Sequence, residues 1–211
     1  MKEKEYTIRR SFKDNASRKL VLNENFIKFE DKDRGSDLFT IFHKDNIESY
    51  TFGIQWIKVK VIIGRIYQIQ IRSKDNKKIK ISFRSYLGRN TNQLNQLYTA
   101  ILSDIWNFYF EGIVINYLQQ FQKNETFSIG DVTFTKENLV IRTPGLLKDT
   151  INTIPWNKVK TKNFYHYFSV YSADDPSSVN RGFSYKDDEN TNVLYSVVRT
   201  ILKNTNKVNS D

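Results

Sequence analysis

The sequence contains no cysteine, and this absence removes several kinds of chemistry at once. Disulfide bonds, thiol nucleophiles and cysteine-based metal sites are excluded, although the absence assigns no compartment by itself. Proline and glycine are scarce, with 3 and 8 among 211 residues, which argues against long disordered linkers. Long apolar runs are also missing, because polar residues interrupt the most apolar window, 101–118. We therefore expect no membrane-spanning helix.

The motifs of common catalytic and cofactor sites are missing as well. His43 and His166 stand without metal-ligand spacing or a neighbouring acidic cluster. The glycines form no phosphate-binding loop, and no Gly-x-Ser-x-Gly elbow occurs. We interpret the chain as a non-enzymatic protein and assign it no catalytic residue, no metal and no cofactor.

The first residues, Met1 to Glu5, are charged and lead into no apolar core. This pattern does not fit a signal peptide. The expected location is the cytoplasm, as a soluble bacterial-type protein, with attachment to the surface of a membrane as a variant of that location.

Two parts of the chain resemble each other. Residues 24–27 (Glu-Asn-Phe-Ile) are echoed by residues 137–140 (Glu-Asn-Leu-Val) at an offset of 113. Farther along the offset is 100, and it relates Phe83 to Phe183, Asn90-Thr91-Asn92 to Asn190-Thr191-Asn192, and Leu94 to Leu194. A repeated supersecondary pattern predicts two similar packed units.

Each copy shows short β-prone runs followed by a helical pattern. Apolar and polar residues alternate over 65–84, which predicts a hairpin with one buried and one exposed face. After Asn90-Thr91-Asn92 two apolar stripes recur at helical spacing, so we predict a long helix over 92–121 that is buried on two sides. A second amphipathic helix follows Asn190-Thr191-Asn192.

This order, six or seven antiparallel strands and then one helix, resembles the pleckstrin-homology-like (PH-like) barrel. The second copy is similar to uncharacterised bacterial PH-like domains in residues 154–159 (Ile-Pro-Trp-Asn-Lys-Val), in its strand over 165–171 and in its helix over 192–202. The resemblance implies an α+β protein of two PH-like antiparallel β-barrels, each capped by a C-terminal helix, the first of which is long and shared. We expect Trp56 and Trp156 to fill the two barrels.

The resulting domain prediction has four parts. A polar lead-in covers 1–17, the first PH-like domain with its long helix covers 18–123, the second covers 124–204, and a frayed tail covers 205–211.

Positive charge is concentrated in one segment of the chain. The net charge is +10, and residues 58–89 hold ten basic residues against a single acid, Asp75. The alternation places them in rows on an outer face of the predicted sheet, and the candidate anion-binding face consists of Arg72, Lys74, Lys77, Lys78, Lys80 and Arg84. A solubilising surface explains the same pattern, and both interpretations stay open.

Two specific ligands of such a face are not expected. Lipid-binding PH members carry a Lys, a Lys or Arg, and an Arg around their first two strands. Here Arg18, Lys19 and Lys28 occur without the final Arg, so no phosphoinositide site is assigned. Specific nucleic-acid binding is disfavoured because Tyr67 and Phe83 fall on the predicted core face, where bases cannot stack on them.

The function predicted from these observations is a non-catalytic scaffold that recognises a protein segment through its PH-like domains. An extended peptide would add to an open strand edge, or lie in the groove between an edge strand and the terminal helix. The alternative is peripheral binding to an anionic membrane or another polyanion through the basic face. An enzyme with an unrecognised site is a third hypothesis.

Overall fold

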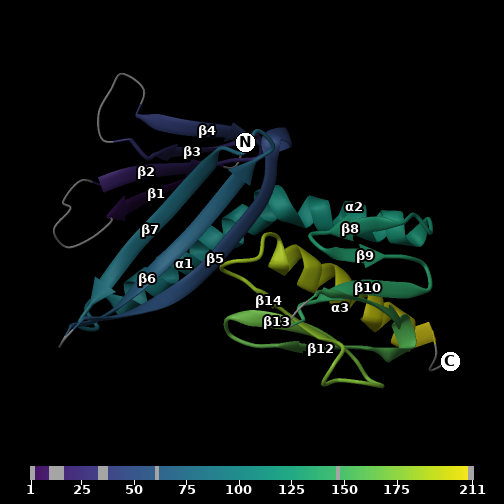
Figure 1. Ribbon diagram of the computed structural model, residues 1–211. Coiled ribbons are helices and arrows are strands. Elements are labelled where there is room, and N and C mark those ends of the chain that lie inside the picture. The colour runs from purple at the N-terminus through teal and green to yellow at the C-terminus, as the bar shows by residue number, and fades with distance from the viewer. Residues whose placement is uncertain (1–2, 10–16, 33–37, 60–61, 146–147, 209–211) are drawn as a thin grey trace. The chain divides into compact units, whose positions relative to one another are not determined.

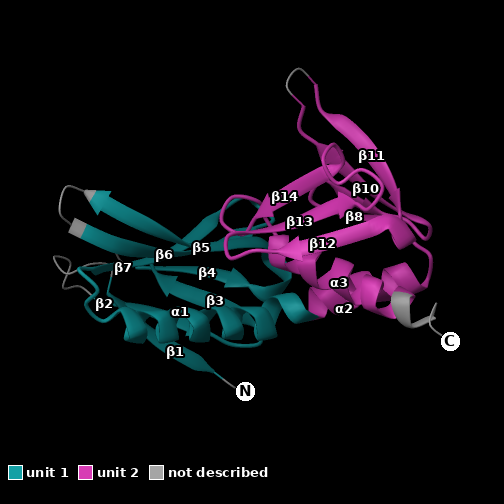
Figure 2. Ribbon diagram, turned by 90° about the horizontal axis from the view of Figure 1, so that it is seen from below, with its two compact units in different colours: residues 1–111 teal, residues 112–211 magenta. Residues whose placement is uncertain are grey.

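The protein is an α+β molecule of antiparallel sheets and a few helices (Figure 1). The computed structural model describes residues 3–9, 17–32, 38–59, 62–145 and 148–208. The chain divides into two compact units, residues 1–111 and 112–211 (Figure 2). No helix in the described part of the chain is long and apolar enough to span a bilayer.

Unit 1 begins with a four-stranded antiparallel sheet in the order β1 (Lys4–Arg9), β2 (Ser17–Leu22), β3 (Phe26–Glu30) and β4 (Phe39–His43). Asn23 builds the β2–β3 turn, because its Oδ1 accepts the backbone N–H groups of Asn25 and Phe26 at 2.9 and 3.0 Å. Ile8 of β1 is fully buried, so a core strand lies within the segment predicted to be a polar lead-in.

A second, three-stranded sheet follows the short 3-10 turn η1 (Lys44–Asn46). It contains β5 (Ile47–Val59), β6 (Ile62–Ser73) and β7 (Lys78–Tyr86), which are long and lie side by side (Figure 1). The predicted inward face is confirmed by the burial of six residues: Tyr67, Ile69, Ile71, Ile79, Ile81 and Phe83. Tyr67 stacks on Phe83 with ring centroids 5.1 Å apart, which ties the two strands together on the core side.

The predicted helix over 92–121 is present as three consecutive segments. They are α1 (Thr91–Ile105), the π-helical turn η2 (Trp106–Phe110) and α2 (Glu111–Gln122). The π turn presents two successive aromatic residues to unit 1. The Tyr109 hydroxyl donates to the carbonyl O of Phe26 at 2.6 Å, and Phe110 stacks on Tyr50 at 4.0 Å.

Unit 2 repeats the strand arrangement. Its sheets are β8 (Phe127–Ile129), β9 (Val132–Phe134), β10 (Asn138–Thr143) and β11 (Thr150–Pro155), then β12 (Val159–Asn163), β13 (Tyr167–Ser172) and β14 (Asn180–Ser184). The 3-10 turn η3 (Trp156–Lys158) separates the two sheets, and α3 (Thr191–Val208) ends the unit. The chain continues helical past Asn204, where the sequence suggested fraying.

The helix layout differs from the prediction of one C-terminal helix per unit, because unit 2 has a helix at each end. Most of α2 belongs to unit 2. Tyr117 stacks on Phe127 at 5.0 Å, and Phe121 meets the Trp156 ring edge-on at 5.3 Å. The apolar stripes of one continuous helix thus serve two different cores.

The predicted closed barrels are also not found. Each unit contains a four-stranded and a three-stranded sheet, and no strand pairing joins the two sheets among the described residues. The chain passes from the first sheet to the second through a 3-10 turn, η1 or η3, which interrupts the strand direction between the two ladders.

Equivalent backbone hydrogen bonds occur in the two units, and they give an alignment that differs from the one predicted. Lys44 N–H donates to Asn25 O at 2.8 Å, and Trp156 N–H donates to Glu137 O at 3.2 Å, which is an offset of 112 instead of 113. Lys74 N–H donates to Asn46 O and Ala173 N–H to Lys158 O, so β13 follows β6 at an offset of 99 and Phe168 corresponds to Ile69. Phe183 pairs with Phe168 and Ile81 pairs with Ile69, so Phe183 corresponds to Ile81 and not to Phe83.

The offset of 100 holds at the helix starts. Asn90 and Asn190 both adopt a left-handed conformation, with φ of 55° and 59°. Thr91 Oγ1 donates to Gly88 O and Thr191 Oγ1 to Asp188 O, both at 3.0 Å.

Candidate functional site

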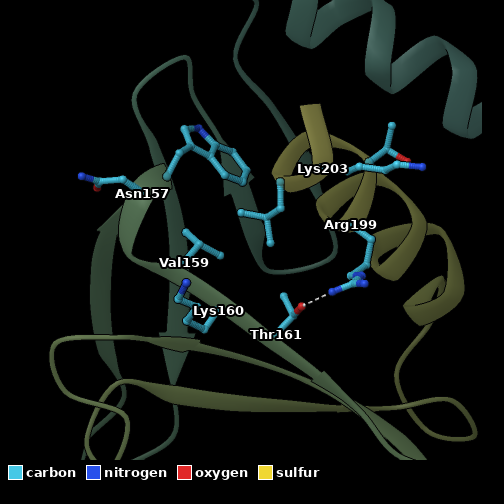
Figure 3. A pocket seen from close by; sticks show the side chains of 9 residues that line it. Asn157, Val159, Lys160, Thr161, Arg199 and Lys203 are labelled. Atoms are coloured by element: carbon cyan, nitrogen blue, oxygen red, sulfur yellow. Dashed lines mark hydrogen bonds between the residues drawn. The ribbon is translucent and has the colours of Figure 1, made fainter. Parts of the chain in front are cut away.

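A cavity of about 550 Å³ lies within unit 2 between β12 and α3 (Figure 3). We call it the β12–α3 groove. Residues from η3 and β12 line one side, and residues of α3 line the other: Trp156, Asn157, Val159, Lys160 and Thr161, then Arg199, Thr200, Leu202 and Lys203.

Helical geometry explains how α3 both packs on the core and borders the groove. Its buried face includes Val193, Val197 and Ile201, all at 2% exposure or less. Arg199, Leu202 and Lys203 are spaced by three and four residues, so they share the adjacent flank of the helix. Burial of the apolar face therefore fixes which way the two cations point.

The apolar side of the groove is held rigidly. The Trp156 ring is only 7% exposed, and its Nε1–H donates to the carbonyl O of Thr135 at 3.0 Å. Val159 beside it is 3% exposed. A buried indole with a satisfied N–H keeps its orientation, so this wall is preorganised for an apolar contact.

The charged side of the groove is entirely cationic. Lys160, Arg199 and Lys203 line it, and none of the described lining residues carries a carboxylate. Arg199 reaches from α3 toward β12, where its Nη1 donates to Thr161 Oγ1 at 3.4 Å (Figure 3). Among the described residues these three cations form no ion pair, and their positive charge is available to an anionic group.

The groove also borders a strand edge. In the described part of the chain β12 is the terminal strand of its sheet and pairs only with β13. A terminal strand offers its backbone N–H and C=O groups to a further strand. A terminal strand, an apolar wall and three cations therefore border the same groove.

The corresponding positions in unit 1 have a different charge. At the offsets of 112 and 100, Lys160 corresponds to Glu48, Arg199 to Thr99 and Lys203 to Ser103. Glu48 is already engaged by Arg72 at 2.5 Å. The cationic lining is therefore a property of unit 2 and not of the repeated fold.

The structure separates the predicted anion-binding face into two groups. Arg72, Lys78, Lys80 and Arg84 share the outer face of β6 and β7, since Arg72 lies opposite Lys78 and the inward face is apolar. Lys74 and Lys77 belong to the turn between these strands.

Two of these six cations already have carboxylate partners. Arg72 pairs with Glu48, and Lys77 pairs with Asp75 at 2.8 Å. The second pair lowers the pKa of Asp75 and raises the pKa of Lys77. Lys78, Lys80 and Arg84 are exposed and have no ion pair with any residue that the structure describes, so they are the strongest part of the predicted face.

The expectation for the two tryptophans is half right. Trp156 is buried as predicted, but Trp56 is 58% exposed and fills no core. Trp56 points to the core face by strand parity, yet β5 and β6 continue past the residues that α1 covers. The alternation of apolar and polar residues predicts which side chains of a strand face the core. It does not predict where along the strand the core ends.

Sequence reasoning did not single out the cations of the groove. Arg199 and Lys203 form an i, i+4 basic pair on an amphipathic helix, a pattern that usually marks a solvated face. Lys160 belongs to an ordinary alternating strand. Only tertiary packing brings them together.

No cluster of metal-binding side chains occurs among the residues described. No protein-family model matches the chain, and no curated protein matches it in sequence.

Proposed function

We propose that the chain is a non-catalytic binding protein that holds an extended, acidic peptide segment in the β12–α3 groove. The observation that carries this proposal is a cavity of about 550 Å³ bounded by a terminal strand and by the last helix. Within the described part of the chain, its lining contains three cations and no carboxylate. We also propose that each unit is PH-like. The supporting feature is the element order, four strands, a 3-10 turn, three strands and a helix, which occurs twice.

The binding mode follows from the groups that line the groove. A peptide strand adds to the edge of β12 through backbone hydrogen bonds, which give affinity without sequence preference. An apolar peptide side chain packs on Trp156 and Val159. Neighbouring carboxylates pair with Arg199 and Lys203, which supplies the specificity because a basic peptide is repelled.

Selection from a displayed library of random twelve-residue peptides tests this function with the full chain as the target. Enriched peptides are expected to combine acidic residues with at least one large apolar residue. Arg199→Glu and Lys203→Glu together should weaken binding of a selected peptide at least tenfold, because two attractive charges become repulsive.

The repeat provides the matched control. Thr99→Glu and Ser103→Glu introduce the same charges at the corresponding positions of unit 1, and binding should be unchanged. Equal losses in both double variants would contradict the assignment to the groove, as would a library without any enriched peptide.

A second candidate function is polyanion binding by the basic face of unit 1. The observation in its favour is the row of exposed cations Lys78, Lys80 and Arg84, which form no ion pair with a residue in the described part of the chain. Binding to heparin resin should fall steeply with salt and be lost in the triple Glu variant at these positions. The peptide selected on the groove should bind that triple variant normally, and this outcome distinguishes the two functions.

A further inference from the structure

The end of the β5–β6 hairpin exposes three large apolar side chains close together. Trp56 is 58% exposed, Ile63 is 51% exposed and Leu87 is 62% exposed. Lys58 pairs with Ile63, so Trp56 and Ile63 share one face of the ladder, and Leu87 N–H donates to Ile63 O at 2.8 Å. We define Trp56, Ile63 and Leu87 as the apolar tip.

The apolar tip continues the core face of the sheet beyond the core. Tyr67 on the same face of β6 is fully buried, whereas Ile63, four residues earlier on that strand, is half exposed. The long strands β5 and β6 (Figure 1) therefore carry apolar residues into solvent. Exposure of apolar surface to water is unfavourable in free energy.

Leu87 is unfavourable for stability in a second way. Its φ is +53°, in the left-handed region where a side chain with a Cβ is strained and where Gly or Asn fits better. The exposed side chain of Leu87 gains little from packing that could offset this strain. Strained backbone that presents an exposed residue is a common feature of binding surfaces.

Cations surround the apolar tip. The Arg65 guanidinium lies over the Trp56 ring at 4.4 Å, Lys58 is exposed in the neighbouring position, and Arg89 follows Leu87 in the turn. From Trp56 to Arg89 the only acidic residue is Asp75, which lies in the β6–β7 turn at the opposite end of these strands. Neither Lys58, Arg65 nor Arg89 forms an ion pair with a residue that the structure describes.

We propose that the apolar tip inserts into the interfacial region of a bilayer that contains anionic lipids, with Lys58, Arg65 and Arg89 at the level of the headgroups. Tryptophan and aliphatic side chains prefer the membrane interface, and nearby basic residues are attracted by the negative surface potential. A second copy of the chain fits less well, because a stable dimer buries roughly 1,200–2,000 Å². Among the residues that the structure describes, the three exposed apolar side chains at this end of the sheet are too few for that area. This site is distinct from the β12–α3 groove and from the outer row of Lys78, Lys80 and Arg84.

Co-sedimentation of the full chain with vesicles tests the proposal. The probes are vesicles of phosphatidylcholine alone and vesicles with about one third phosphatidylserine. Binding is expected only to the second kind, and it should weaken at high salt. Trp56→Ala and Ile63→Ser should each weaken binding at least tenfold. Ile41→Ser, which removes an exposed isoleucine from β4 of the same unit, should have no effect.

The charges are tested in the same assay. Lys58→Glu and Arg89→Glu should each weaken vesicle binding about fivefold or more, since each basic residue near an anionic surface contributes roughly that factor. Lys136→Glu in unit 2 is the matched control. Circular dichroism of each variant confirms that it is folded.

Fluorescence locates the inserted residue. The emission of the wild-type chain should shift to the blue with anionic vesicles and be quenched by brominated lipids, and both effects should disappear in Trp56→Phe. The proposal is overturned if the chain does not bind anionic vesicles, or if Ile41→Ser weakens binding as much as Ile63→Ser. Self-association that depends on Trp56 in the absence of vesicles would also overturn it in favour of a second copy.

Discussion

At the scale of single residues, position relative to the core decides what an aromatic side chain does. Trp156 and Trp56 both follow strand-like patterns in the sequence, yet one is 7% exposed and the other 58%. Trp156 is fixed by a hydrogen bond to Thr135 and by the ring of Phe121. Trp56 has only Arg65 over its face. We expect Trp156 to stabilise the fold and Trp56 to contribute little to its stability.

Replacement of the two tryptophans measures this difference. Trp156→Ala should lower the free energy of unfolding by about 3–5 kcal/mol, because it removes a large buried ring and leaves a cavity. Trp56→Ala should change it by no more than about 0.5–1 kcal/mol, as for other exposed positions. Urea denaturation followed by circular dichroism gives both values, and comparable losses would show that Trp56 is part of the core.

The environment of Tyr185 predicts how the free energy of unfolding depends on pH in the alkaline range. Its hydroxyl donates to Asn163 Oδ1 at 2.7 Å, and burial, followed by the charge of Tyr195, raises its pKa to about 12. The unfolded chain loses this proton near pH 10. The stability contributed by the neutral Tyr185 is therefore fully present below pH 10 and is lost as the pH rises from 10 to about 12.

Tyr185→Phe should make the free energy of unfolding fall less steeply between pH 10 and 12. Urea denaturation at a series of pH values measures the slope. Burial also raises the pKa values of Tyr6 and Tyr109, so some slope remains in the variant. Tyr165→Phe, at a residue 74% exposed, is the control. Identical slopes for wild type and Tyr185→Phe would refute the assignment.

At the scale of elements, the period of the apolar pattern was sufficient to predict which face of most strands and helices is buried. It was insufficient to predict where the buried part of each element ends. The alternation over 65–84 was confirmed because an antiparallel ladder repeats every two residues, whichever partner it meets. The position of the long helix was also predicted. The π turn within this helix was not predicted. One extra residue in a helical turn is accommodated by tertiary contacts, which the sequence does not show.

Deletion of Asn107 tests why the π turn exists. With one residue fewer, the helix cannot present both Tyr109 to Phe26 and Phe110 to Tyr50. We expect a loss of about 3–5 kcal/mol in the free energy of unfolding, similar to the loss of one buried aromatic side chain. Asn107→Ala keeps the length of the helix and should be nearly neutral, since Asn107 is exposed. A deletion variant as stable as wild type would show that the turn adapts freely.

At the scale of the whole molecule, the repeat is a property of the fold, while the candidate sites differ between its copies. Both units share the strand order and the hydrogen bonds around η1 and η3. The cations of the β12–α3 groove occur in unit 2, and the apolar tip occurs in unit 1. The same element order thus carries different surface residues in the two units.

The division between Glu111 and Gly112 predicts where the chain can be cut. A fragment of residues 112–211 should unfold cooperatively, because it retains the rings of Tyr117 and Phe121 that pack on Phe127 and Trp156. A fragment of residues 124–211 lacks both rings and should be less stable by several kcal/mol, or unfolded. Thermal denaturation of the two fragments measures the difference. Equal stability would show that α2 is not part of the core of unit 2.

The sequence by itself predicted two similar units, strands with one buried face, and helices that start at the Asn-Thr-Asn segments, where α1 begins at Thr91 and α3 at Thr191. These features depend on neighbours along the chain. Tertiary structure alone decided the offset of 112, since a slip of one residue exchanges the two faces of a strand. The turn hydrogen bonds and the burial of Ile27 and Leu139 both require this offset. Tertiary structure also decided where the core ends at Trp56 and which cations of α3 meet β12, because these contacts join residues far apart in the sequence.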